Sequence, residues 1–125
     1  MIFKTRLPFP VSVNGLYGGG SGQKRFPSKK YKAWLQSCPT LEPLGIDYPV
    51  KIIYTFSWPD KRRRDLGNYT KAPLDFLVNQ GVLKDDNWEI VTCEILKHDG
   101  VKKDNPGVLI EILRASDDTP CIHTL

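Results

Sequence analysis

Alternation of apolar and polar residues predicts four strands along the chain. The first runs from Ile2 to Leu7 and stops at a Pro-x-Pro sequence. Between Val50 and Ser57 every second residue is large and apolar, which favours a strand with one buried face. Two further strands are predicted at Glu89 to Lys97 and Val108 to Leu113, joined by a polar loop that contains two glycines. The segment from Val11 to Pro27 lacks either periodicity and is predicted to be a long loop.

A first amphipathic helix is predicted from Lys29 to Cys38, with Ser28 as its N-cap. Its large apolar residues recur at helical spacing and form one stripe, while the lysines lie on the other side. The stripe consists of Tyr31, Trp34, Leu35 and Cys38. We treat Trp34 as a core residue.

A second helix is predicted from Leu66 to Asn79, with Gly81 as its C-terminal stop. Pro73 is the discordant residue, and it fits only if the regular helix starts near Asn68 or Tyr69, or if a longer helix is kinked. The element order is β-α-β-α-β-β. This order predicts an α+β fold, a small mixed sheet of about four strands with both helices packed on it.

Length and composition restrict the class of protein. A chain of 125 residues fits one domain, residues 1–125, and 40% hydrophobic with 26% charged residues favours a globular fold over disorder. No apolar run approaches the roughly 20 residues of a membrane span, so no membrane partner is expected. The first residues do not resemble a secretory signal, and there is no Cys-x-x-Cys motif for zinc. A cytoplasmic location is therefore expected.

Positive charge is concentrated in two short segments, although the net charge is only +4. Lys61, Arg62, Arg63 and Arg64 form a block of four, and a second group consists of Lys24, Arg25, Lys29, Lys30 and Lys32. Such blocks are typical of a polyanionic partner, and equally of a solvated surface.

The residues after the basic block carry candidate chemistry. If the stretch is helical, Asp65, Asn68 and Lys71 share one face, with an axial rise of about 4.5 Å between the first two. One ion or phosphate could then contact Asp65 and Asn68, while Lys71 could reach it with its flexible side chain. Asp75 lies about 15 Å along the axis from Asp65, too far to share an ion, and is interpreted as an exposed or helix-packing carboxylate.

A second acidic element, Asp85 and Asp86, precedes a predicted strand. Asp65 together with Asp86 would supply the one or two carboxylates that Mg²⁺ usually takes from protein. The ion could activate a water for attack on a phosphodiester, with Lys71 balancing charge on the phosphoryl group. The alternatives are that Asp65 caps a helix and that the acidic pair forms a turn.

The chain resembles the RusA family of Holliday-junction resolvases over nearly its whole length. The most specific part is Arg-Arg-Arg-Asp-Leu-Gly-Asn-Tyr-Thr-Lys at 62–71, followed by Pro-Leu-Asp-Phe-Leu at 73–77 and Gly-Val-Leu-Lys-Asp-Asp at 81–86. Leu-Pro-Phe-Pro at 7–10 and Ser-Val-Asn-Gly-Leu-Tyr at 12–17 resemble the opening segment of the family. Residues 27–34, Pro-Ser-Lys-Lys-Tyr-Lys-Ala-Trp, resemble its first helix.

The resemblance implies a homodimeric, Mg²⁺-dependent endonuclease that makes paired nicks in four-way junction DNA during recombination and repair. Such enzymes are frequently encoded by phages and prophages, so the setting would be the cytoplasm of a bacterial or phage-infected cell. Carried over residue by residue, the catalytic residues are Asp65, Lys71 and Asp86 with Asp85 beside it, and the metal ligands are Asp65, Asp86 and Asn68. The expected DNA contacts are Lys61, Arg62, Arg63 and Arg64, with weaker candidates at Asn14, Tyr17, Lys24 and Arg25.

One position departs from the family motif, which commonly reads Asp-x-Asp-Asn. The second acid is Gly67 here, so one candidate ligand and one negative charge are missing. We expect cleavage with reduced metal affinity. The alternatives are a junction-binding protein that no longer cuts and, more distantly, an RNA-binding accessory protein.

Overall fold

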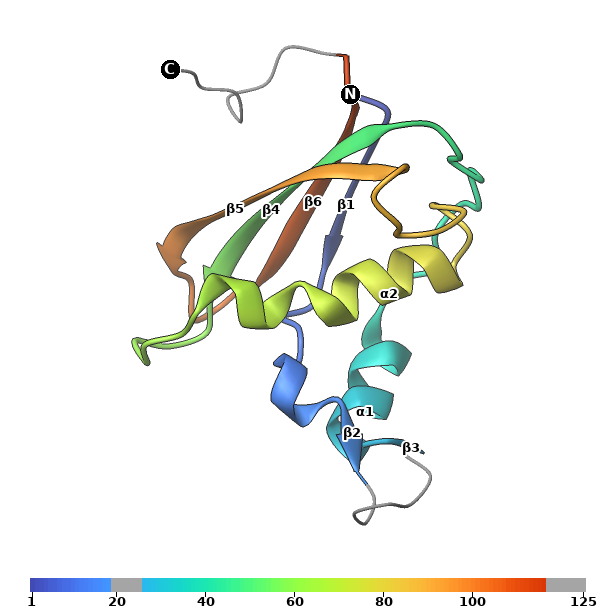
Figure 1. Cartoon of the computed structure of the whole chain (residues 1–125). Helices are drawn as coiled ribbons and strands as arrows, with labels where there is room; N and C mark the ends of the chain where they lie inside the picture. Colours follow the sequence, from blue (N-terminus) through green and yellow to red (C-terminus); the bar gives the residue numbers. More distant parts are fainter. Residues whose placement is uncertain (19–25, 117–125) are drawn as a thin grey trace.

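A four-stranded mixed sheet forms the centre of the fold in the computed structural model, which describes residues 1–18 and 26–116 (Figure 1). Its strands lie in the order β1-β6-β4-β5. β6 pairs antiparallel with both β1 and β4, and β4 pairs parallel with β5. The bounds are β1 (Phe3–Leu7), β4 (Val50–Trp58), β5 (Val91–Val101) and β6 (Gly107–Arg114). The predicted α+β fold with a mixed sheet is confirmed.

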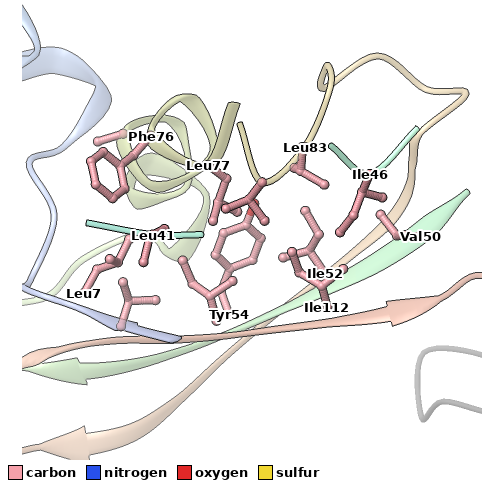
Figure 2. Close-up of a cluster of buried hydrophobic side chains, with 14 of the residues drawn as sticks. Leu7, Leu41, Ile46, Val50, Ile52, Tyr54, Phe76, Leu77, Leu83 and Ile112 are labelled. Atoms are coloured by element: carbon pink, nitrogen blue, oxygen red, sulfur yellow. The ribbon is translucent and has the colours of Figure 1, made fainter. Parts of the chain in front are cut away.

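The core lies between one face of the sheet and the helical layer. Ile52 and Tyr54 of β4 are fully buried, as the alternating pattern predicted. Figure 2 shows them beneath Leu77 of the second helix and Leu83 of the segment that follows it. β6 adds Ile112 to the same cluster, so the central strands and the helical layer share one apolar core.

The first helix, α1 (Lys29–Ser37), begins where its cap predicted. The Ser28 hydroxyl accepts a hydrogen bond from the Tyr31 backbone N–H at 3.1 Å. Trp34 is only 5% exposed, its indole N–H donates to the Pro8 carbonyl at 3.0 Å, and its ring meets Phe76 edge-on at 5.8 Å. α1 therefore packs beside the second helix, which itself lies across the sheet (Figure 1).

The second predicted helix is two elements, a 3-10 turn η2 (Leu66–Tyr69) and the α-helix α2 (Lys71–Asn79). The predicted start at Leu66 was wrong, and the alternative of a later start for the regular helix is closer to the structure, because a proline inside a helix lacks the N–H that bonds four residues back and clashes there. Pro73 is instead the third residue of α2, where backbone N–H groups have no intrahelical acceptor. Gly81 ends the helix with φ +79°, a conformation that favours glycine.

The predicted long loop contains short regular pieces. These are the 3-10 turn η1 (Val13–Gly15) and a two-stranded ribbon of β2 (Tyr17–Gly18) and β3 (Phe26–Pro27). Ser28, which follows β3, is joined to η1, since its hydroxyl donates to the Gly15 carbonyl at 2.6 Å. The candidate DNA contacts Lys24 and Arg25 lie outside the described residues. Within the described part of the chain, no helix is long and apolar enough to cross a membrane.

Candidate functional site

The four cations of the basic block are not equivalent. They lie in the segment from Asp60 to Asp65, called here the basic loop, which leaves the end of β4. Lys61, Arg62 and Arg63 are exposed, whereas the Arg64 side chain is only 7% exposed. The loop therefore presents three cations to solvent and retains the fourth.

Arg64 is held by a carboxylate and by aromatic rings. Its two terminal nitrogens donate to the two oxygens of Asp60 at 2.8 and 3.1 Å. The guanidinium carbon lies 5.4 Å from the centre of the Phe9 ring and 5.8 Å from that of Trp58. The Arg64 hydrogen bonds, followed by the Arg62 backbone N–H, lower the pKa of Asp60 to about 2, so this carboxylate is ionised at neutral pH.

A hollow of about 590 Å³ opens beside the basic loop. Asp65 lines it and is exposed, and its side chain makes no capping hydrogen bond to η2. Asp65 thus occupies the N-cap position of η2, but its carboxylate does not cap the turn. Trp58 and His98 form another part of the wall, with ring centres 5.9 Å apart. His98 was not among the sequence candidates, because it reaches this hollow only through the pairing of β5 with β4.

Lys71 belongs to a different group of charges. It is the first residue of α2, and its ammonium lies 3.2 Å from the carboxylate of Asp75 one turn later. The hydrogen bond to Asp75 is the main cause that raises the pKa of Lys71, and Asp86 adds to the shift. The sequence interpretation missed Asp75 as a partner of this lysine, although the i, i+4 spacing is the usual signal for such a pair.

Asp85 and Asp86 face different hollows, as expected for neighbouring carboxylates on a loop. Asp86 lines a hollow of about 310 Å³ with Asp75, Tyr17 and Tyr31. Asp85 lines another, of about 370 Å³, and its two oxygens accept from the Asp86 N–H at 2.7 Å and the Asn87 side chain at 3.0 Å. These bonds lower the pKa of Asp85, the Asp86 N–H contributing most. Asp85 shapes the loop, while the side chain of Asp86 is exposed beside its hollow.

A buried tyrosine joins two neighbouring strands of the sheet, β4 and β5. The Tyr54 hydroxyl on β4 donates to the Glu94 carboxylate on β5. Burial raises the pKa of Tyr54 far above its usual range, and the charges of Glu94 and Asp86 raise it further. Asp86 is therefore close enough to Tyr54 for its charge to act on the hydroxyl. Glu94 gave no sequence signal beyond its place on a predicted strand.

The donor types fit a hard divalent cation, but their arrangement does not gather a full ligand set. Asp65 and Asp86 are exposed carboxylates, the ligands that Mg²⁺ takes from protein one or two at a time. They line different hollows. Among residues 1–18 and 26–116, no three His, Cys, Asp or Glu side chains come together around a possible metal position. Asn68 is half-buried, and its backbone N–H donates to the Asp65 carbonyl at 3.0 Å.

Comparison with known proteins decides the family. The family model described as endodeoxyribonuclease RusA matches residues 17–113. The chain belongs to the RusA family of endodeoxyribonucleases. The RusA proteins named crossover junction endodeoxyribonuclease include one from Aquifex aeolicus that is 33% identical over 116 residues, covering 89% of this chain and 88% of the relative. Another, from Enterobacteria phage 82, is 32% identical over 96 residues, 73% of this chain and 78% of the relative.

Membership of the RusA family implies dependence on a divalent metal. It also makes Gly67 the position of most interest. A Cβ built at Gly67 meets no atom within 4 Å, and the backbone there is in an ordinary conformation. The fold therefore leaves open space for an aspartate side chain at position 67, and neither packing nor backbone conformation requires a glycine there.

Proposed function

We propose that this protein is an Mg²⁺-dependent endodeoxyribonuclease that resolves four-way DNA junctions by paired nicks. The observation that carries the proposal is the hollow in which Asp65 lies beside three exposed cations, within a chain of the RusA family. Backbone phosphates of DNA are the polyanion that such a cation row binds, largely without regard to sequence. In this proposal, Asp65 beside those cations would act, through a bound metal ion, on a phosphate that the cations hold.

The proposed roles follow the family motif. Asp65 and Asp86, with Asn68, would hold Mg²⁺, which when bound lowers the pKa of a coordinated water and neutralises charge on phosphate oxygens. The two carboxylates line different hollows in one chain. Each would therefore supply only one ligand, and water and phosphate oxygens would complete the coordination of the metal. Lys71, kept protonated by Asp75, would balance negative charge on the phosphoryl group. Asp85 would keep the loop of Asp86 in shape.

A homodimer in the cytoplasm is part of the proposal. A four-way junction presents two equivalent strands, and a two-fold symmetric enzyme would offer one site to each. Asn14 and Tyr17 are exposed, and both are proposed as further contacts with a DNA strand. Tyr17 also lines the hollow that contains Asp86.

The decisive experiment compares the native protein with Asp65→Asn on a synthetic four-way junction in Mg²⁺. We expect the native protein to make paired nicks and Asp65→Asn to bind the junction without cutting it. Glu42→Gln is the matched control, because it also removes one exposed carboxylate but lies in the linker before β4. If the native protein and Asp65→Asn both bind and neither nicks, the chain is a non-cleaving junction binder. Equal affinity for junction, linear duplex and RNA would instead favour an RNA-binding accessory protein.

A further inference from the structure

We propose that Arg64 is a positioning residue of the basic loop, and that it fixes the three exposed cations and Asp65 through Asp60 without itself contacting DNA phosphate. This inference rests on the proposed function, because it concerns how the same surface receives DNA. It assigns Arg64 a different role from Lys61, Arg62 and Arg63, although all four form one basic block in the sequence.

The first support is the surroundings of the Arg64 guanidinium. An arginine that binds backbone phosphate needs its donors free and directed outward. Two donors of Arg64 are instead used by the Asp60 carboxylate at 2.8 and 3.1 Å, and the side chain is 7% exposed. Its planar group lies by the Phe9 and Trp58 rings, an arrangement that uses the attraction of a cation for an aromatic ring.

The aromatic rings beside Arg64 belong to a packed cluster of three. Phe9, Trp58 and Tyr69 contact one another with centroid distances of 5.3 to 6.0 Å. They come from three separate segments, the one after β1, the end of β4, and η2. Arg64 contacts two of these rings, Phe9 and Trp58, and so connects the basic loop to the segment after β1 and to the end of β4.

The second support is what Asp60 holds besides Arg64. The same oxygen that accepts from Arg64 also accepts the backbone N–H of Arg62 at 2.9 Å. One carboxylate therefore fixes both the buried arginine and the backbone that carries the exposed ones. Asp65 directly follows Arg64, so the position of the candidate catalytic carboxylate depends on the same anchor.

A change of sign tests the inference. Asp60→Asn removes a negative charge beside the proposed DNA path, and simple attraction predicts tighter binding to junction DNA. The positioning role predicts weaker binding, by about fivefold, the upper range for a partly exposed ion pair. Binding is measured by fluorescence anisotropy with a synthetic four-way junction, without divalent metal so that nothing is cut. Glu42→Gln is the matched control and should bind as tightly as the native protein or slightly more tightly.

A double-mutant cycle supplies the second arm. Arg64→Gln should weaken binding, and Asp60→Asn combined with Arg64→Gln should be no weaker than Arg64→Gln alone, because both changes remove one contact. Binding by Asp60→Asn at native strength or better would overturn the inference, as would additive losses in the cycle. Circular dichroism and thermal unfolding check that each variant folds, and Asp60→Asn, at a 43% exposed side chain, keeps the test valid if Arg64→Gln does not fold.

The two proposals can fail separately. If the native protein nicks junctions and Asp60→Asn nicks them equally well, the junction-resolving function stands and the role of Arg64 falls. If the native protein nicks no junction, the function falls, while anisotropy of the same variants on linear duplex still reports whether Arg64 fixes the cations.

Discussion

Neutralising the three exposed cations of the basic loop should reduce the salt dependence of DNA binding by a definite amount. The variant replaces Lys61, Arg62 and Arg63 with glutamine and leaves Arg64 in place. Each phosphate contact on duplex DNA contributes about 0.9 to the slope of log binding constant against log salt concentration. Three exposed cations therefore contribute about 2.7. Between about 50 and about 200 mM salt, the native protein should lose about fortyfold more affinity than the variant.

The assay is a titration of labelled junction arms at several salt concentrations, without divalent metal. Replacing Lys29, Lys30 and Lys32 with glutamine is the control, because it removes the same charge from exposed positions of α1. The control should change the slope less than the loop variant does. An unaltered slope in the loop variant would show that these cations do not contact DNA. An equal change in both variants would show a general effect of net charge rather than a DNA-binding surface at the basic loop.

Three further predictions concern the metal, the core and the charge of the anchor. Gly67→Asp should tighten Mg²⁺ binding measured by calorimetry, because its side chain has open space two residues after Asp65; unchanged titration curves would contradict this. Leu77→Ala should lower the free energy of unfolding in urea by about 2–5 kcal/mol, since Leu77 is fully buried, and a loss under about 1 kcal/mol would show that the site collapses around the change. Asp60 should titrate by ¹³C NMR near pH 2 instead of 3.8, because Arg64 favours its charged form; its stabilising contribution is then complete above about pH 4 and lost as pH falls towards 2, and a midpoint near 4 would refute the anchor.

The strands and the first helix could be predicted because their signals are local. The alternation from Val50 to Ser57 corresponds to a strand whose apolar positions are buried, and Ser28 caps α1 as its residue type indicated. The family motif likewise needs only adjacent residues. Such features depend on neighbours a few positions away, which the sequence displays directly.

The arrangement of the candidate site could not be predicted in the same way. Arg64 looks like its neighbours in sequence, and its contacts with Asp60, Trp58 and Phe9, the last 55 positions earlier in the chain, distinguish it. The spacing argument for Asp65 and Lys71 assumed a continuous helix, and the break before Lys71 removes that geometry. The closeness of Asp86 to Tyr54 depends on how the loop after α2 lies on the sheet, whereas the pairing of Lys71 with Asp75 follows the local i, i+4 spacing and could have been predicted. Tertiary contacts therefore determine which groups the candidate site residues contact, and the sequence alone identifies only the candidates.

The position of β6 between β1 and β4 has a consequence for how the protein is made. Phe3 pairs with Ile112, so a strand synthesised at the start waits for one synthesised more than a hundred residues later. While a ribosome is still producing residues before Gly107, β1 and β4 lack the neighbour that joins them. Helical segments can form early, but the sheet closes only when its middle strand emerges. The central sheet is therefore completed only after β6 has been synthesised, so its formation depends on contacts far apart in the sequence.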